Sequence, residues 1–345
     1  MRLLAAPLAA LALTGCGGGA EEARPPDPTA GPVPTTAPAT TAVPDEPVEL
    51  ELTTVLEGLE TPWALAWDAE GTLWVTERPG RLRSGGGDVR EVEGVVERGE
   101  GGLMGLEIDA EGRFLLMYTA ADENRVVRLE DDGLQTTLLD GIPAAAIHDG
   151  GRIRLAADGA LFVSAGDAAQ PELAPDPGSL AGKVLRIAPG GEARVFSRGH
   201  RNVQGLCFGP GGTLYATEHG PDVGDEVQVL EEGGDGGWPE RTGGGLRDYT
   251  PTIAPGGCAF YDADLIPQWR GSLLVVTLKD QSLRRLELDG DEVVDEEVLY
   301  QGELGRLRDV RVGPDGAVYV TTSNRDGRGS PSAGDDRVVR IGPAG

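Results

Sequence analysis

The chain has 345 residues, enough to bury a large core, and its 54 glycines and 25 prolines favour short strands and many turns over long helices. Its 57 acidic and 30 basic residues give a formal net charge of −27. A surface of this sign repels nucleic acid and anionic lipid headgroups, so we exclude polyanion-binding functions and expect no nucleic-acid partner.

The N-terminus resembles an export signal. Residues 1–16, MRLLAAPLAALALTGC, combine an arginine with an apolar stretch that is too short to span a bilayer. Its end, Leu13-Thr14-Gly15-Cys16, resembles a bacterial lipoprotein box in which Cys16 becomes the lipidated first residue; an ordinary signal peptide is the alternative. Residues 17–47 are rich in Pro, Thr and Ala without apolar periodicity, which is typical of a disordered tether. We therefore expect an extracytoplasmic globular domain over residues 48–345, lipid-anchored to the cell membrane through Cys16.

One unit recurs six times along this domain. Each copy has an apolar strand, a turn ending in glycine and a second apolar strand, and the copies cover residues 65–77, 106–119, 153–167, 206–219, 259–279 and 310–324. Their turn glycines are Gly71, Gly112, Gly159, Gly212, Gly271 and Gly316. A third strand follows each hairpin and a more polar fourth segment follows most of them. Four strands per repeat are typical of a propeller blade, so the sequence predicts an all-β, six-bladed β-propeller rather than an ordinary sandwich.

The two ends of the domain indicate how the ring closes. The last repeat ends at Gly345 without a fourth strand, whereas Val48–Val55 (VELELTTV) alternates as a strand and precedes the first hairpin. We expect this N-terminal strand to complete the sixth blade, because it would cover an otherwise exposed edge.

Two cysteines lie within the domain. Cys207 and Cys258 both stand in apolar strand contexts, GLCFG and GGCAFY. Outside the cytoplasm a disulfide is permitted, but spacing alone does not decide the pairing. We favour two buried free thiols, with a bridge as the alternative.

The rare residue types fall in loops between predicted strands. All three histidines do so (His148, His200 and His219), and Lys279, one of only two lysines, ends a strand. Propellers bind ligands at the mouth of the central channel, on the loops that connect neighbouring blades. These residues therefore predict a site on one face of the ring.

The loops also carry a family resemblance, which covers residues 50–345 in order. The matching stretches include TPWALAWDAEGTLWVTERPGRL, GEGGLMGLEI, HDGGRIRLAADGALFVSAGD, GHRNVQGL, TEHGPDVGDEV, PTIAPGGCAFY, TLKDQSLRRLEL and GRLRDVRVGPDG. Together they resemble the soluble pyrroloquinoline quinone (PQQ)-dependent aldose and sorbosone dehydrogenases.

The resemblance implies a reaction. His148 would be the general base that takes the proton of the C1 hydroxyl of an aldose or a related hydroxyaldehyde, while hydride passes from C1 to PQQ. The product would be a lactone or acid, and the electrons would go on to an unknown acceptor. Imidazole suits this task because it can accept a proton at neutral pH. Asp167 matches the carboxylate that orients the base.

The resemblance also implies cofactor and metal ligands. Cofactor contacts would come from Glu100, Arg201, Asn202, Thr252, Lys279, Arg306 and Arg308. The carbonyls of Gly220 and Pro221 would bind the Ca²⁺ that polarises PQQ, and Glu226, assisted by Asp225, would bind a second, structural Ca²⁺. Arginine grips carboxylates bidentately, and hard oxygen ligands suit Ca²⁺.

Two positions depart from the family pattern. Glu100 stands where the family usually has Gln, and its charge would repel an anionic cofactor by up to ~4 kcal/mol unless it is protonated or turned away. Only Tyr249 supplies an aromatic side chain where some relatives hold sugar. Glu100 keeps open the alternative of a binding module without functional PQQ. A separate alternative is a calcium-dependent lactonase, against which the Arg/Lys set argues.

Overall fold

The structure is a computed structural model that describes residues 46–290 and 292–344. The expected signal peptide, Cys16 and all but the last two residues of the expected tether lie outside the described residues. Within them, strands dominate, and the helices are three short 3₁₀ segments, Pro171–Leu173, Pro210–Gly212 and Pro267–Trp269. No helix of this part of the chain has the length and apolar character needed to cross a bilayer.

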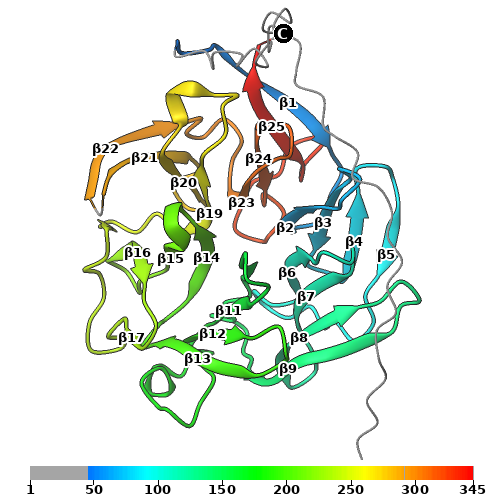
Figure 1. The fold of residues 1–345 in the computed structure, drawn as a ribbon, viewed down its shortest axis with the longest axis vertical. Coiled ribbons are helices and arrows are strands. Elements are labelled where there is room, and N and C mark those ends of the chain that lie inside the picture. The colour runs from blue at the N-terminus through cyan, green and yellow to red at the C-terminus, as the bar shows by residue number, and fades with distance from the viewer. Residues whose placement is uncertain (1–45, 291, 345) are drawn as a thin grey trace, which may run out of the picture. The chain divides into compact units, whose positions relative to one another are not determined.

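Each predicted repeat forms a sheet built on four strands, and the six sheets surround a central axis (Figure 1). From the axis outwards, the first sheet holds β2 (Pro62–Trp67), β3 (Leu73–Glu77), β4 (Arg81–Ser84) and β5 (Val89–Glu91). The second holds β6 (Leu103–Ile108), β7 (Phe114–Thr119), β8 (Glu123–Leu129) and β9 (Gln135–Pro143). The third holds β10 (Ile153–Leu155), β11 (Leu161–Ala165), β12 (Lys183–Ile187), β13 (Ala193–Arg198) and the short parallel strand β17 (Gly234–Asp235).

The second half of the ring repeats this plan. The fourth sheet holds β14 (Val203–Phe208), β15 (Leu214–Glu218), β16 (Asp225–Leu230) and β18 (Arg247–Tyr249). The fifth holds β19 (Pro255–Tyr261), β20 (Ser272–Thr277), β21 (Leu283–Asp289) and β22 (Glu292–Leu299). The sixth holds β23 (Leu307–Val312), β24 (Val318–Thr322), β25 (Val338–Pro343) and β1 (Leu50–Leu56). The prediction of an all-β, six-bladed propeller is confirmed.

The six turn glycines explain why each blade begins with a tight hairpin. All six have φ between 77° and 84°, in the left-handed region where a side chain is disfavoured. Each turn reverses the chain between an inner strand and the next strand of the same sheet. The recurring glycine in the sequence therefore marks the first turn of each blade.

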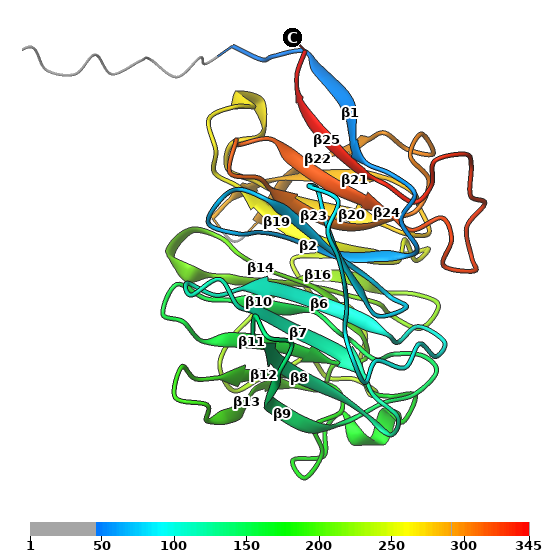
Figure 2. The same ribbon diagram turned by 90° about the vertical axis from the view of Figure 1, so that its right-hand side faces the viewer.

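The N-terminal strand lies in the last sheet, as Figure 2 shows from the side. β1 pairs antiparallel with β25, from Leu50 opposite Pro343 to Leu56 opposite Val338. The sixth sheet therefore combines strands from both ends of the described chain, and its fourth strand comes from the N-terminal segment that the sequence indicated.

The cysteine prediction was wrong. Cys207 and Cys258 form a disulfide that joins β14 to β19, with their Cα atoms 5.7 Å apart. Both residues are buried on the inner strands of adjacent blades. Adjacency around the ring brings the two thiols together, and the spacing in the sequence does not report that adjacency.

Candidate active site

A cavity of about 190 Å³ lies over the N-terminal ends of the inner strands. Four of its lining residues are each the second residue of such a strand: Trp63 of β2, Met104 of β6, Gln204 of β14 and Arg308 of β23. Because these strands surround the axis, the cavity occupies one mouth of the central channel. Loop residues complete the lining, namely Glu100, Asp149, Gly150, His219, Ala254, Leu278, Lys279, Arg306 and Arg328.

The lining carries more positive than negative charge. Its cations are Lys279, Arg306, Arg308 and Arg328, and its acids are Glu100 and Asp149. This is the reverse of the chain as a whole, whose net charge is −27. The cavity is therefore suited to an anionic ligand that the rest of the surface would repel.

Arg308 has a donor to spare inside this cavity. Its Nη1 donates to Oε1 of Gln204 at 2.6 Å, and its guanidinium carbon lies 5.6 Å from the Trp63 ring centroid. Its buried Nε has no hydrogen-bond partner among the described residues. Burial lowers the pKa of Arg308 to about 10. A bound carboxylate would satisfy the free donor and stabilise the buried charge.

Two further predicted cations are fixed beside Arg308. Arg306 forms an ion pair with Asp326 at 2.7 Å and donates to the carbonyl of Leu278 at 3.0 Å. Lys279 is exposed and donates from Nζ to Oγ1 of Thr252 at 2.6 Å. The structure thus brings Lys279, Arg306 and Arg308 together in the cavity lining, and Thr252 is connected to them through Lys279.

His148 and Asp167 form a hydrogen-bonded pair at the edge of the cavity, next to the lining residue Asp149. Nδ1 of His148 lies 2.8 Å from Oδ1 of Asp167, whose side chain is fully buried. His148 has φ of 64°, and its carbonyl lies so close to Gly166 that a Cβ there would approach it to 1.9 Å. Glycine in the SAGD stretch is therefore required for Asp167 to reach the imidazole.

Asp167 is held from a second side by Trp238. The indole Nε1 donates to Oδ2 of Asp167 at 2.9 Å, and the backbone N–H of Ala169 donates to Oδ1 at 2.8 Å. The guanidinium of Arg201 lies 5.5 Å from the Trp238 ring centroid. Trp238 therefore links the His148–Asp167 pair to Arg201, a predicted cofactor ligand, although these residues lie far apart in the sequence.

Glu100 lines the cavity, and its carboxylate is engaged by two partners. Its Oε2 accepts the backbone N–H of His148 at 3.1 Å, and its Oε1 forms an ion pair with Arg328 at 2.7 Å. Burial favours the neutral acid, but these two interactions outweigh it and hold the pKa of Glu100 below its ordinary value. Glu100 is therefore an ionised carboxylate whose charge is matched by Arg328.

Asn202 and Gln204 fasten the loop that follows His148. Oδ1 of Asn202 accepts the N–H of Gly150 at 3.2 Å and the Nε2–H of Gln204 at 2.9 Å. Nε2 of Gln204 also donates to the Gly150 carbonyl at 3.0 Å. Asn202 thus connects to the cavity through the backbone beside the base.

His219 lines the same cavity, and it is followed by the predicted calcium-binding residues up to Glu226. His219 donates from Nε2 to the carbonyl of Pro255 at 2.8 Å, and burial lowers the pKa of its imidazole to about 4. Asp225 accepts the N–H groups of Gly220, Ile253 and Ala254 at 2.6–2.8 Å. Its carboxylate therefore fixes the loop that contains Gly220 and Pro221.

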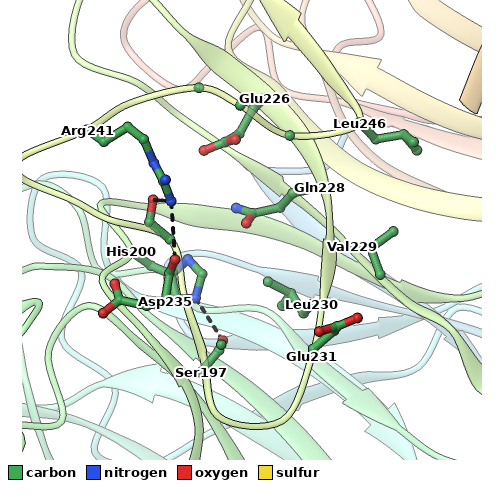
Figure 3. Close-up of a pocket in the computed structure, with 15 residues that line it drawn as sticks. Ser197, His200, Glu226, Gln228, Val229, Leu230, Glu231, Asp235, Arg241 and Leu246 are labelled. Atoms are coloured by element: carbon green, nitrogen blue, oxygen red, sulfur yellow. Dashed lines mark hydrogen bonds between the residues drawn. The ribbon is translucent and has the colours of Figure 1, made fainter. Parts of the chain in front are cut away.

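Glu226 faces a different and larger cavity of about 480 Å³, lined by residues of the outer strands β13, β16 and β17 of the third and fourth sheets (Figure 3). Burial and the neighbouring carboxylates of Glu218 and Asp248 raise the pKa of Glu226 to about 8. A small cavity of about 10 Å³ also lies between Glu218 and Glu226. Within the described ranges, no three His, Cys, Asp or Glu side chains are grouped to hold a metal ion. A cation here would need backbone carbonyls as well as carboxylates.

His200 supports the site from this second cavity. Its Nε2 bonds Oγ of Ser197 at 2.7 Å (Figure 3), and its Nδ1 bonds Oε2 of Glu218 at 2.9 Å. Oε1 of the same Glu218 accepts the backbone N–H of Arg201. His200 is thus buried behind Arg201, so the three histidines do not share one surface as the sequence suggested.

Sequence reasoning missed five residues at the site: Trp63, Asp149, Gln204, Trp238 and Arg328. Gln204 lies inside the recognised stretch GHRNVQGL. Trp63 and Asp149 lie inside the recognised stretches TPW and HDGG, so attention to each residue of those motifs could have found them. Trp238 and Arg328 lie in loops that no predicted motif covers, and only the fold brings them to the site.

The chain is thus a six-bladed propeller with a hydrogen-bonded histidine–carboxylate pair beside a cationic channel mouth. The sequence model of the family described as "Glucose / Sorbosone dehydrogenase" matches residues 59–330, and the chain belongs to this family of sugar dehydrogenases. The aldose sugar dehydrogenase of Escherichia coli strain K12 is 30% identical over 342 residues, covering 81% of this chain and 92% of that protein.

Two solved structures extend the comparison. An oxidoreductase (glucose dehydrogenase) from Thermus thermophilus is 41% identical with a TM-score of 0.78, covering 85% of this chain and 100% of that one. The PQQ-bound aldose sugar dehydrogenase of Streptomyces coelicolor is 32% identical with a TM-score of 0.77, covering 86% of this chain and 99% of that one.

Proposed function

We propose that the protein oxidises the C1 hydroxyl of an aldose or related hydroxyaldehyde to a lactone or acid, with PQQ and Ca²⁺ as cofactors. The observation that carries this proposal is the His148–Asp167 pair at the edge of a cavity with excess positive charge. When bound, PQQ supplies the two-electron acceptor for the hydride that leaves C1. An external electron acceptor of unknown identity would reoxidise the protein.

The residues present fit an anionic quinone with three carboxylates. Arg308 has an unused buried donor, Arg306 and Lys279 line the same cavity, and Arg201 donates to the carbonyl of the lining residue His219. Glu100, the residue that argued against the cofactor, is paired with Arg328. These cations would hold the carboxylates of PQQ, with Asn202 and Thr252 as neighbouring polar contacts.

Calcium would be held on the adjacent loop. The Gly220 and Pro221 carbonyls would bind the ion at the cofactor, on a loop that Asp225 fixes through its hydrogen bonds. The Glu226 carboxylate would bind a second ion, because a divalent cation relieves the repulsion that raises its pKa.

His148 would act as the general base. Asp167 accepts the Nδ1–H of the imidazole, which leaves the lone pair of Nε2 free to take the proton of the sugar C1 hydroxyl. The buried carboxylate then stabilises the imidazolium that forms. Trp238 and the backbone of Ala169 keep Asp167 in place through this proton transfer.

The test mixes the metal-stripped protein with PQQ and Ca²⁺ and follows the quinone absorbance after addition of an aldose. We expect bleaching with the parent protein. His148→Gln should bind PQQ but bleach it roughly 10²–10⁴-fold more slowly, the usual contribution of a positioned base. Arg201→Ala should weaken PQQ binding first. Failure of the parent to bind PQQ would favour the binding-module alternative, and unchanged bleaching by His148→Gln would exclude His148 as the base.

We also propose that the protein is exported and anchored by lipid on Cys16. The Leu-Thr-Gly-Cys stretch supports this, and the Cys207–Cys258 disulfide fits an oxidising compartment. Cys16→Ser should move the protein from the membrane fraction to the medium. A variant that remains with the membranes would exclude this anchor.

A further inference from the structure

The pair Glu100–Arg328 joins two parts of the ring across the edge of the cavity. Glu100 lies just before β6 of the second sheet, and Arg328 lies in the loop between β24 and β25 of the sixth. Oε1 of Glu100 and Nη1 of Arg328 are 2.7 Å apart, with the two side chains 27% and 58% exposed. The ion pair therefore spans the inner end of the first blade.

Asp326 fixes the backbone of Arg328. The N–H of Arg328 donates to Oδ1 of Asp326 at 2.9 Å, and Oδ2 of the same Asp326 pairs with Arg306. The loop is thus attached to the cavity wall two residues before Arg328. This attachment places the Arg328 guanidinium within reach of Glu100.

Glu100 has a second partner that connects it to the chemistry. Its Oε2 accepts the N–H of His148, a residue with φ of 64° whose backbone conformation needs outside support. The backbone N–H of Glu100 in turn donates to the carbonyl of Ala146 at 2.9 Å. Glu100 therefore bonds both sides of the turn that presents the imidazole.

We propose that Glu100 is a positioning residue for His148, and that Arg328 makes its ionised carboxylate compatible with an anionic cofactor in the same cavity. This inference rests on the proposed function. The carboxylate gives the His148 N–H a charged acceptor, which is stronger than a neutral one, but it adds a negative charge where PQQ must bind. Arg328 cancels that charge on the cavity side.

The first test measures PQQ binding at equilibrium, without sugar, by quenching of tryptophan fluorescence. Arg328→Gln leaves Glu100 ionised and unmatched, so we expect its Kd for PQQ to rise at least tenfold. Glu100→Gln removes the negative charge, so its Kd should equal the parent value or fall below it. Glu100→Gln combined with Arg328→Gln should return the Kd to within about threefold of the parent.

Two controls make the comparison specific. Arg328→Lys keeps the charge and should bind PQQ like the parent. Arg325→Gln changes an arginine of the same loop that bonds the Asp335 carbonyl and does not line the cavity, so its Kd should also be unchanged. Circular dichroism checks that each variant is folded. If Arg328→Gln binds as tightly as the parent, or if the double variant remains as weak as Arg328→Gln, charge compensation is wrong.

The second test separates positioning from charge. With PQQ saturating, Glu100→Gln keeps an oxygen acceptor for the His148 N–H and should retain most of the parent kcat, whereas Glu100→Ala should lose at least tenfold in kcat with little change in the KM for sugar. Equal kcat values for the two variants would overturn the positioning role. If the parent protein binds no PQQ, both the proposed function and this inference are wrong. If the parent binds PQQ and the Glu100 and Arg328 variants behave like the parent, only this inference is wrong.

Discussion

Nδ1 of His148 and Oδ1 of Asp167 are 2.8 Å apart, and the carboxylate is inaccessible to solvent. Asp167 also accepts N–H groups from Trp238 and Ala169. Both oxygens are thus engaged, so the carboxylate cannot rotate away from the imidazole without breaking several hydrogen bonds. The tautomer of His148 and the direction of Nε2 follow from this arrangement.

Asp167→Asn should test this control of the tautomer. An amide can present an N–H to Nδ1, which would shift the proton of neutral His148 to Nε2 and remove the basic lone pair from the substrate side. We expect kcat to fall roughly 10²–10⁴-fold with PQQ affinity nearly unchanged, as measured by steady-state kinetics and fluorescence titration. Trp238→Phe, which removes a single hydrogen bond to Asp167, should cost less than Asp167→Asn; the reverse order would contradict the assignment.

The Cys207–Cys258 disulfide should contribute measurably to stability. It links positions separated by 51 residues in the chain, and removing a cross-link of this kind typically lowers the free energy of unfolding by about 2–4 kcal/mol. Urea denaturation of the Cys207→Ala/Cys258→Ala variant measures this loss. Dithiothreitol should destabilise the parent and leave the variant unchanged. Equal stability of parent and variant would mean that the bond is not formed in solution.

Removal of residues 48–55 should destabilise the sixth blade. The deletion takes away most of β1 and exposes the hydrogen-bonding edge of β25, so the melting temperature should fall by several degrees or more. Deletion of residues 17–45, which precede the strand, provides the control and should leave the melting temperature of the propeller unchanged. Identical melting of both deletions would show that β1 is dispensable.

Because of His219, the free energy of unfolding should depend on pH in the acid range. Burial lowers the pKa of its imidazole from 6.5 to about 4, so between these values the unfolded chain binds a proton that the folded protein does not. The free energy of unfolding should therefore fall as the pH drops through this window, by up to about 3 kcal/mol. His219→Gln cannot titrate there and should show a shallower loss. Parallel denaturation curves across pH 4–7 would contradict the buried neutral imidazole.

Local signals made the fold predictable. The turn glycines, such as Gly71 and Gly316, need a left-handed backbone in every blade, so one conformational requirement recurs as one residue type. The role of the Val48–Val55 segment was predictable because this segment alternates as a strand and the last repeat lacks a fourth strand. Both arguments depend on residues close together in the sequence.

The site was predictable only in part. Glu100 was singled out for its charge, but its partner Arg328 is 228 positions away and belongs to no motif, so the sequence could not show that the charge is matched. The prediction of free thiols at Cys207 and Cys258 failed for the same reason, since their pairing depends on which inner strands are neighbours. Contacts between blades are set by the ring, and a single sequence carries little record of them.

The shared sixth sheet has a consequence for the order of events in biosynthesis. β1 is among the first strands of the propeller to be made, yet its hydrogen-bonding partner β25 is the last, ending at Pro343. The earliest strand must therefore stay without this partner until β25 has been made, whereas each intervening blade can form as soon as its own strands have been made. A nascent or prematurely terminated chain that lacks β25 would consequently keep β1 unpaired.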